Sequence, residues 1–230
     1  MNNSVAIITA RGGSKRIPRK NIKDFLGRPI IAYSISAALE SGCFAEVMVS
    51  TDDEEIAKLA RLLGAKVPFM RSAENSNDFA GTAEVIREVI LKYRSIGKAF
   101  DSLCCIYPTA PFITADRLLN AMTILKKTNA DCVLPAVAFS YPIQRSLKIE
   151  DGRAVMFWPE NYAKRSQDLV PAYHDSGQFY CMKVTSLLKQ MKLFAEHTVP
   201  IVVPESEVQD IDNEEDWKIA ELKYRIMSAF

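Results

Sequence analysis

A basic run that contains two glycines lies near the amino terminus and has the residue types that bind phosphate. Residues 11–20 read Arg-Gly-Gly-Ser-Lys-Arg-Ile-Pro-Arg-Lys, so the run holds five basic side chains and no acidic one. Glycine lets backbone amides face an anion because it has no Cβ, and successive amides in a turn form a concave anion site. Lys and Arg add full charges, and the planar guanidinium of Arg suits phosphate. The run therefore predicts a polyphosphate-binding loop.

Runs of charge are more often solvated surface than binding sites, but the position of this run favours binding. It follows apolar residues 5–9, which predict a buried strand, and the loop after a first strand is where α/β proteins hold a polyphosphate. The formal net charge is only +1, so overall composition does not account for the cluster. The run matches neither G-x-x-x-x-G-K-[ST] nor G-x-G-x-x-G, which excludes a Walker A loop and weakens the case for a nicotinamide-dependent oxidoreductase.

A pair of aspartates near the carboxyl terminus could bind a metal ion. Asp210 and Asp212 are two residues apart, so on an extended segment both side chains point the same way and can ligate one hard cation. Mg²⁺ usually takes one or two carboxylates and completes its shell with water and substrate phosphate. The alternative is a helix amino terminus rich in acids, which suits the helix dipole. That alternative explains residues 214–216 better than it explains the aspartate pair.

Other polar segments are less specific on their own. The run Pro108-Thr109-Ala110-Pro111 follows an expected strand and forms either a ligand-binding turn at the sheet edge or a simple strand terminator. Arg71 and Thr82 are most simply a surface charge and a helix cap. Ser, His and Asp occur together within 174–176, but hydrolase triads draw on separate parts of a fold, so this strand is expected only to contact substrate.

Apolar runs that predict strands alternate with helical patterns through the first 140 residues. We expect strands at 5–9, 46–51, 66–70, 103–107 and 132–137, and later at 154–158, 177–182 and 199–203. Helices are expected at 29–39, 82–96, around 118–125 and at 213–227, the first of them with Pro29 in its first position. A further helix is expected to begin at a capping box of Thr51 and Glu54 and to end at Gly64. This alternation predicts an α/β fold with a mostly parallel sheet and helices on both faces.

Bulk composition predicts one soluble domain. The 230 residues are 48% apolar and 25% charged, as in ordinary globular proteins. The near-zero net charge gives no general field for nucleic acid or membranes. No apolar stretch approaches a membrane span or a signal-peptide core, so a cytoplasmic location is expected. The five cysteines show no metal-binding spacing and are expected to be small buried hydrophobic residues with free thiols.

The alternating pattern stops at about residue 140. Residues 141–172 are rich in Pro, Lys, Arg and aromatic residues. We expect this segment to leave the sheet as an inserted arm within a single domain of 1–230, acting as a lid, a dimerisation element, or both.

Several of these motifs together resemble those of the CMP-sugar synthetases, cytidylyltransferases that activate acidic nine-carbon and eight-carbon sugars. The resemblance covers nearly the whole chain and rests on the following runs: Ala10-Arg11-Gly12-Gly13-Ser14-Lys15, Lys20-Asn21, Val49-Ser50-Thr51-Asp52, Arg71-Ser72-Ala73-Glu74, Pro108-Thr109-Ala110-Pro111 and Asp210-Ile211-Asp212. Tyr107 and the run from His174 to Tyr180 are most similar to the branch that acts on pseudaminic acid. The branches that act on sialic acid, legionaminic acid and Kdo remain alternatives.

The resemblance implies a Rossmann-like nucleotidyltransferase fold, a homodimer, and a Mg²⁺-dependent transfer of CMP from CTP to the anomeric hydroxyl of the sugar. It also implies roles for individual residues. Arg11, Lys20 and Asp212 would be catalytic, and Asp210 and Asp212 would bind Mg²⁺. The nucleotide would contact Ala10, Arg11, Gly13, Ser14, Lys15, Lys20, Asn21, Arg71, Asp78, Thr82, Pro108 and Thr109. The sugar would contact Tyr107, His174, Asp175 and Gln178.

Two further classes of protein stay open at this stage. Another sugar nucleotidyltransferase could use a different base or sugar, and pyrophosphate release with different nucleotides separates the two. A non-catalytic nucleotide-binding module has no use for a pair of metal-binding aspartates, so metal dependence discriminates against it.

Overall fold

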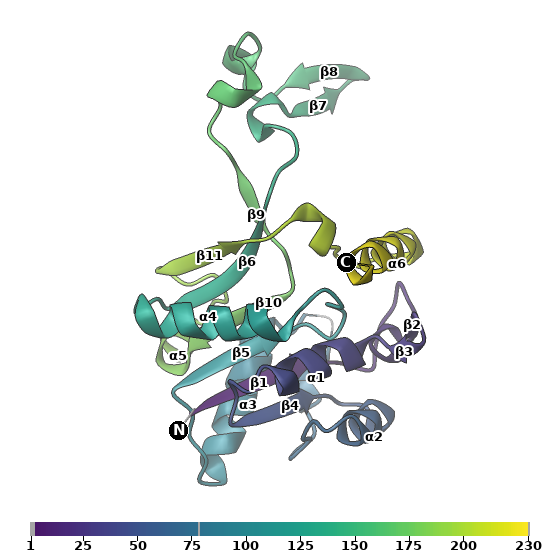
Figure 1. Ribbon diagram of the computed structural model, residues 1–230, viewed down its shortest axis with the longest axis vertical. Coiled ribbons are helices and arrows are strands. Elements are labelled where there is room, and N and C mark those ends of the chain that lie inside the picture. The colour runs from purple at the N-terminus through teal and green to yellow at the C-terminus, as the bar shows by residue number, and fades with distance from the viewer. Residues whose placement is uncertain (1–2, 78, 230) are drawn as a thin grey trace.

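A seven-stranded sheet forms the centre of the protein (Figure 1). The computed structural model describes residues 3–77 and 79–229. The sheet has the order β11-β6-β10-β5-β1-β4, with β9 paired to β6. Its strands are β1 (Ser4–Thr9), β4 (Glu46–Ser50), β5 (Ser102–Ile106), β6 (Cys132–Ala138), β9 (Tyr173–Asp175), β10 (Phe179–Lys183) and β11 (Thr198–Val202).

The direction of the strands confirms a mostly parallel sheet. Strand β1 pairs in parallel with β4 and β5, and β11 pairs in parallel with β6. Strand β10 is antiparallel and lies between β5 and β6, and β9 is also antiparallel to β6. The loops that follow β1, β4 and β5 therefore leave the same edge of the sheet, which is where open α/β folds bind ligands.

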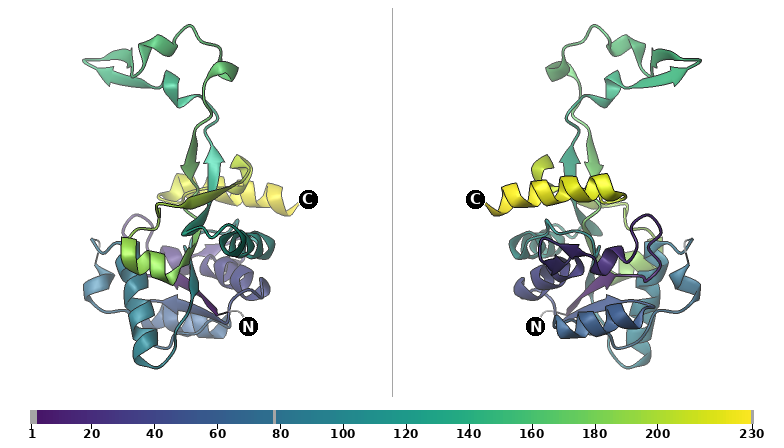
Figure 2. Two further views of the ribbon diagram at one scale, coloured as in Figure 1. Left: turned by 90° about the vertical axis from the view of Figure 1, so that its left-hand side faces the viewer. Right: turned by 90° about the vertical axis from the view of Figure 1, so that its right-hand side faces the viewer.

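Helices cover both faces of this sheet, as the sequence predicted (Figure 2). Helices α1 (Ile31–Glu40), α2 (Glu54–Leu62) and α4 (Ala115–Lys127) pack on one face, and α3 (Thr82–Ser95) and α5 (Val184–Gln190) pack on the other. Ala6 and Ile8 of β1 belong to the first core, whereas Val5 and Ile7 belong to the second. Burial on both faces explains why this strand is a continuous apolar run.

Helix α6 (Glu214–Ser228) packs on a separate small core. Its Trp217 and Ala220 contact Phe25 and Tyr33 in that core, with Tyr224 at its border. Phe25 and Arg28 lie in the short hairpin of β2 (Asp24–Phe25) and β3 (Arg28–Pro29). The carboxyl-terminal helix is thus anchored beside the segment that follows the basic run.

The starts of two helices differ from the sequence prediction. Pro29 lies in β3 and not in α1, because the chain first forms the β2–β3 hairpin and enters the helix only at Ile31. Helix α2 is capped by Asp53, whose side chain accepts a hydrogen bond from the Ile56 amide. The expected cap, Thr51, instead accepts a hydrogen bond from the Asp53 amide.

The expected strand at 66–70 is reduced to a single bridge between Met48 and Lys66. Val49 donates to the Lys66 carbonyl, and the Lys66 amide donates to Val47, but pairing stops there. Pro68 has no amide hydrogen and cannot continue a ladder.

In α3, Gly81 and not Thr82 is the capping position, and the Glu84 carboxylate accepts a hydrogen bond from the Gly81 amide (2.8 Å).

All five cysteines are free and buried, as expected. Cys104, Cys105, Cys132 and Cys181 lie in central strands of the sheet. Burial raises the pKa of the Cys105 thiol to about 12. The Cys105 thiol is therefore a protonated packing group rather than a nucleophile.

Residues 141–172 lie between β6 and β9 and extend away from the body of the protein (Figures 1 and 2). The segment contains the hairpin of β7 (Leu147–Glu150) and β8 (Arg153–Met156). It also contains three short 3₁₀ turns: η3 (Ile143–Arg145), η4 (Pro159–Asn161) and η5 (Ser166–Asp168). Among the residues that the structure describes, no helix is both long enough and apolar enough to cross a bilayer.

Glu88 of α3 holds the loop that follows the Met48–Lys66 bridge. Its carboxylate accepts hydrogen bonds from the amide and hydroxyl of Ser72 (2.9 and 2.8 Å) and from Asn75, and it pairs with Lys92 (2.6 Å). Burial alone would raise the pKa of Glu88, but these hydrogen bonds outweigh burial and lower the pKa to about 2. The ionised form of Glu88 is therefore a clamp for residues 72–75.

We predict that Glu88→Gln lowers the free energy of unfolding by about 1–3 kcal/mol at pH 7, because charged hydrogen bonds of this strength are lost. A carboxylate whose pKa is depressed in the folded state stabilises the fold above its unfolded pKa and loses that effect as pH falls. The difference between wild type and variant should shrink as pH falls from about 4.5 toward 2, the range between the two pKa values. Urea unfolding at several pH values measures both effects.

The matched control is Glu40→Gln at an exposed position on α1, which should leave unfolding unchanged. A difference between wild type and Glu88→Gln that stays constant across this pH range would contradict the clamp.

Candidate functional site

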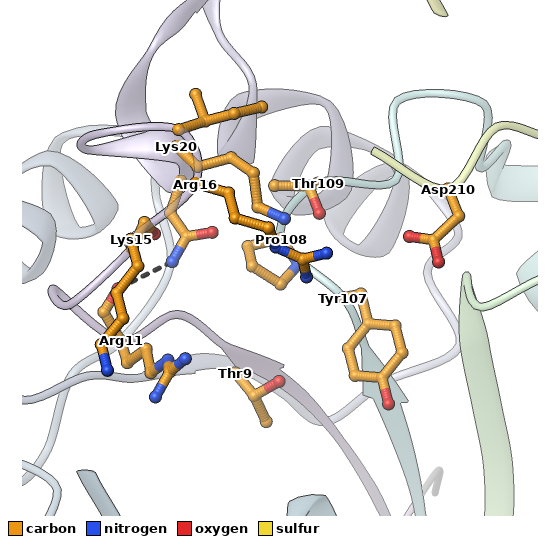
Figure 3. Close-up of a pocket in the computed structure, with 12 residues that line it drawn as sticks. Thr9, Arg11, Lys15, Arg16, Lys20, Tyr107, Pro108, Thr109 and Asp210 are labelled. Carbon is orange, nitrogen blue, oxygen red and sulfur yellow. Dashed lines mark hydrogen bonds between the residues drawn. The ribbon is translucent and has the colours of Figure 1, made fainter. Parts of the chain in front are cut away.

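A cavity of about 410 Å³ lies at the carboxyl edge of the sheet, above β1 and β5 (Figure 3). The residues that line it come from the loop after β1, from η1 (Lys20–Ile22), from the turn after β5 and from the segment before α6. They are Thr9, Arg11, Ser14, Lys15, Arg16, Ile17, Lys20, Asn21, Tyr107, Pro108, Thr109 and Asp210. Three sequence motifs that are far apart in the chain thus surround one cavity.

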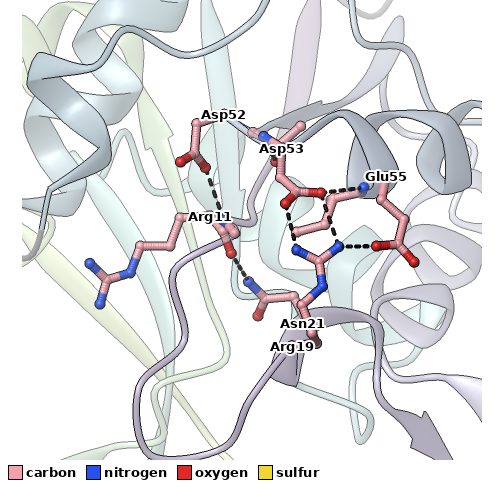
Figure 4. Close-up of polar contacts among 9 residues, drawn as sticks. Arg11, Arg19, Asn21, Asp52, Asp53 and Glu55 are labelled. Atoms are coloured by element: carbon pink, nitrogen blue, oxygen red, sulfur yellow. Dashed lines mark hydrogen bonds and ion pairs between the residues drawn. The ribbon is translucent and has the colours of Figure 1, made fainter.

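The turn after β4, which contains Asp52 and Asp53, holds the basic loop in place (Figure 4). The Gly12 amide donates to Asp52 Oδ1 (2.9 Å), and Asn21 Nδ2 donates to the Arg11 carbonyl (2.8 Å). A Cβ at Gly12 would lie 2.7 Å from Asp53 Oδ2, so only glycine fits there. The Gly12 amide was expected to face a bound phosphate, but it donates its hydrogen bond to the Asp52 carboxylate instead. Gly13 has no atom near its virtual Cβ and borders open space.

Arg19 belongs to the basic run but serves as a second clamp rather than a cavity wall. It lies in the left-handed region (φ 56°) and pairs with Asp53 (2.5 Å) and Glu55 (2.5 Å). The hydrogen bond to Asp53 raises the pKa of the Arg19 guanidinium, and the same bond lowers the pKa of Asp53. One of the five basic side chains is thus used to hold the loop in place.

Lys20 joins the basic loop to the aspartate segment. Its Nζ donates to the carbonyl of Ile211 (2.6 Å), a contact between residues 191 positions apart. Burial lowers the pKa of Lys20, although Asp212 and Asp210 oppose this. Burial, and then the charge of Asp212, raises the pKa of Asp210. Two carboxylates and an ammonium therefore lie close together in a partly dehydrated space.

Asp210 and Asp212 lie on either side of Ile211 in the sequence, and the Ile211 side chain is buried. Ile211 is buried in the small core beside Trp217, and Asp210 lines the cavity on one side of it. On the other side Asp212 pairs with Arg16 (2.6 Å). Figure 3 shows the side chains of Arg16 and Lys20 directed into the cavity, toward Asp210.

The helix that follows has acids of its own. Asn213 caps α6, and the Asp216 carboxylate accepts hydrogen bonds from the amides of Asp212 and Asn213. Glu214 pairs with Lys23 (2.7 Å). The helix terminus thus accounts for residues 213–216, whereas Asp210 precedes it and faces the cavity.

Three other residues expected at the nucleotide, Ala10, Arg71 and Thr82, are not among the residues that line the first cavity. Ala10 is buried and its amide donates to the Ser50 carbonyl (2.9 Å). Arg71 donates to the hydroxyl and carbonyl of Ser50, and burial lowers the pKa of its guanidinium. Thr82 Oγ1 lies 3.4 Å from the Tyr107 hydroxyl. Asp78, also expected here, lies outside the described residues.

A second cavity of about 520 Å³ adjoins the first and shares Tyr107 and Asp210 with it. It lies among β9, the start of β10, the segment around η6 (Glu205–Glu207) and α6. Its lining residues are Tyr107, Val137, His174, Asp175, Ser176, Gly177, Tyr180, Glu205, Val208, Gln209, Asp210 and Lys223. Three of the four residues expected at the sugar therefore line this cavity.

The walls of the second cavity are held by polar contacts. The Tyr180 hydroxyl and the Gly177 amide both donate to the Asp175 carboxylate. The Tyr180 ring packs edge-on against Tyr107, with 5.8 Å between centroids. Gln178, expected to contact sugar, is 2% exposed, and its Nε2 donates to the Glu207 carbonyl (2.8 Å). Gln178 is therefore bonded to the last residue of η6 and does not line the cavity.

Sequence reasoning missed several residues of the site. Asp52 was noted only as part of a resembling run, and its bond to Gly12 requires β4 to lie beside β1. Gln209 and Lys223 belong to no pattern that signals chemistry, and Ser176 was noted only within a strand expected to contact substrate. They reach the cavity only because three separate segments fold around it.

Comparison with known proteins finds relatives over nearly the whole chain. A 42% identical relative, over 97% of both chains, is the pseudaminic acid cytidylyltransferase of Campylobacter jejuni. A 32% identical relative, over 94% of both chains, is the CMP-N,N'-diacetyllegionaminic acid synthase of Legionella pneumophila. A similar solved structure is that of a CMP:2-keto-3-deoxy-manno-octonic acid synthetase complexed with CTP, with a TM-score of 0.69, 18% identity and 99% coverage of both chains.

The family model described as cytidylyltransferase matches residues 5–202, which include the basic loop and the turn after β5. With this match and two near-full-length relatives above 30% identity, the chain belongs to the cytidylyltransferase family.

Proposed function

We propose that this protein transfers CMP from CTP to the anomeric hydroxyl of an acidic nonulosonic sugar, with release of pyrophosphate, and that pseudaminic acid is its sugar. The observation that carries the proposal is the contact of Lys20 with the Ile211 carbonyl, which joins the basic loop to the segment that holds both aspartates and supports a shared site at the cavity that Lys20 and Asp210 line. The choice of sugar is supported by the name of the 42% identical relatives.

The first cavity is proposed to bind CTP. Arg11, Ser14, Lys15 and Lys20 line it and supply positive charge and a hydroxyl donor for the triphosphate. Asn21, Arg71 and Thr82, with the turn at Pro108-Thr109, are proposed to contact the nucleoside. Because the substrates are both anions, offsetting their charge is a large part of catalysis, as in phosphoryl transfer generally.

Asp210 and Asp212 are proposed to hold Mg²⁺. The donor set fits this ion, since two carboxylates leave room for water and substrate phosphate in its shell. The present partner of Asp212 is Arg16, and both side chains are substantially exposed, so this ion pair stabilises little and can be displaced. When bound, Mg²⁺ supplies Lewis-acid stabilisation of the phosphate oxygens.

The second cavity is proposed to bind the sugar. It meets the first at Tyr107 and Asp210, so a sugar held there lies next to the phosphates of CTP. Holding two reactants in contact replaces a bimolecular encounter by an oriented one, which supplies much of the rate enhancement in such reactions. His174 and Asp175 line this cavity and offer polar contacts for hydroxyl and amide groups.

We further propose that residues 141–172 form a dimerisation arm. An isolated two-stranded hairpin is marginally stable in water, and the β7–β8 hairpin extends away from the body (Figure 2). Ile149 in this hairpin is 81% exposed, and Leu147, Phe157 and Tyr162 are also exposed. A second copy of the chain would cover these apolar side chains.

The proposed function predicts pyrophosphate release from CTP, and not from UTP, GTP or ATP, when an acidic sugar and Mg²⁺ are present. Among pseudaminic, legionaminic and N-acetylneuraminic acids, pseudaminic acid should give the highest kcat/KM. A coupled pyrophosphate assay on this panel measures both preferences, and release with all four nucleotides would contradict the proposal.

Lys20→Gln is the variant expected to be impaired in that assay. Its kcat/KM should fall by more than ~10-fold, since a lost charged contact to phosphate costs ~1.5–3 kcal/mol. Lys58→Gln, at an exposed position on α2, should behave as wild type.

The proposed metal site predicts that Asp212→Asn lowers kcat/KM by at least ~100-fold while the protein stays folded, because a metal contributes several kcal/mol of charge stabilisation. Excess EDTA should abolish turnover, and added Mg²⁺ should restore it. Circular dichroism checks the fold.

Glu215→Gln in the first turn of α6 is the control, since it removes an acid from the helix terminus but not from the cavity. Equal loss of activity in both variants, or unfolding of Asp212→Asn alone, would favour a helix-terminus role for Asp212.

The proposed arm predicts that Ile149→Glu converts a dimer to a monomer, because a charge cannot be buried at an apolar interface without a partner. Size-exclusion chromatography with light scattering measures the mass. Leu62→Glu, at an exposed position on α2, should leave the mass unchanged. A wild-type protein that is monomeric at micromolar concentration would rule out the arm as a stable dimer contact.

A further inference from the structure

Lys223 places a positive charge on the wall of the second cavity. The residue lies in α6, and its ammonium donates to two backbone carbonyls, those of Val208 (2.7 Å) and Glu205 (3.1 Å). Glu205 is the first residue of η6 and Val208 follows its last, so neutral acceptors at both ends of η6 hold the Lys223 side chain in one place. An ammonium has three donors, and two are used here.

Lys223 makes no salt bridge among the residues that the structure describes. It is also the only Lys or Arg among the described residues that line the second cavity. A cation that is fixed by carbonyls and left without a carboxylate is prepared to bind an anion.

Among the described residues, three carboxylates line the same cavity: Asp210, which the first cavity shares, and two that already accept hydrogen bonds. Asp175 accepts hydrogen bonds from Tyr180 and Gly177, and Glu205 Oε2 accepts one from the Ser140 hydroxyl (2.7 Å). They add negative charge to the cavity walls, which by itself would repel an acidic substrate. Lys223 is the lining group whose full charge offsets that repulsion.

A second observation is an unpartnered hydroxyl on the wall of this cavity. Ser176 lines it and is 4% exposed, yet its Oγ has no hydrogen-bond partner. Buried hydroxyls in folded proteins almost always have a partner. The orphaned hydroxyl is satisfied if the cavity takes a ligand that carries hydrogen-bonding groups.

We propose that Lys223 binds the carboxylate of the acidic sugar and thereby makes the enzyme select sugar acids over uncharged sugars, with the Ser176 hydroxyl as a neighbouring polar contact. This inference rests on the proposed function. Lys223 is a specificity-determining residue in this account, because it recognises a group that does not react. The competing account is purely structural, with Lys223 serving only to hold η6 through the two carbonyls.

The test compares an acidic sugar with its carboxamide, using CTP, Mg²⁺ and the sugar acid that wild type turns over best. The carboxamide keeps the shape of the substrate but removes its charge. Wild type should prefer the acid over the amide by about 10- to 100-fold in kcat/KM, the range expected for one charged hydrogen-bonded contact. Lys223→Gln should lose most of this preference, with a raised KM for the acid and an unchanged KM for CTP.

Conservative and control variants separate the two accounts. Lys223→Arg keeps the charge and should retain part of the preference for the acid. Lys218→Gln, an exposed lysine on the same helix, should retain all of it. An acid preference that is equal in wild type and Lys223→Gln, with both substrates impaired alike, would assign Lys223 a structural role only.

The result also distinguishes this inference from the proposed function. If wild type makes a CMP-sugar but shows no preference for the acid, the role of Lys223 fails and the proposed function stands. If wild type releases pyrophosphate with none of the sugar acids, the proposed function fails, and the role of Lys223 fails with it.

Discussion

The hydrogen bond from Lys20 to the Ile211 carbonyl is the contact on which the site depends. It joins the loop after the first strand to the segment before the last helix. Its geometry is set from both ends: the loop is clamped by Asp52 and by Arg19 with its acidic partners, and Ile211 is anchored in a core with Trp217. Together with the ion pair between Arg16 and Asp212 (2.6 Å), this contact holds the basic loop beside the aspartate segment.

The cavity concentrates charge that is balanced within the site itself. Arg16 neutralises Asp212 at the rim, and Lys20 lies near both aspartates. Burial lowers the pKa of Lys20 and raises the pKa of Asp210, and the attraction between these two opposite charges opposes both shifts. A triphosphate gives these cations stronger partners than exposed carboxylates do, which is consistent with a site organised for nucleotides before any nucleotide binds.

Much of the fold could be predicted from the sequence because it follows from local patterns. Continuous apolar strands such as β1 are buried on both faces, and helical spacing of apolar residues identified the helices that cover them. The errors arose where a tertiary contact overrode a local rule. Asp53 replaced Thr51 as a cap because it also binds Arg19, and pairing at 66–70 ended because Pro68 has no donor.

The site was predictable only in part for the same reason. The basic loop and the aspartate pair have residue types that imply chemistry. The structure brings the loop and Asp210 to one cavity, and it pairs Asp212 with Arg16 of the loop. The use of the Gly12 amide by Asp52 depends on the pairing of β1 with β4, so the sequence around Gly12 suggested an anion contact instead. Lys223 is one of two lysines in a charged helix and carries no signal until α6 packs against η6.

The two cavities therefore differ in how they are built. The first is made by the ends of central strands and the loops directly attached to them, which a parallel sheet always brings together. The second is made by β9, η6 and α6, which are later elements that pack at the margin of the sheet. A family that keeps one nucleotide and changes its sugar can vary the second set without disturbing the first. On this argument, selectivity for the sugar belongs to residues such as Lys223 and Ser176 that no nucleotide motif contains.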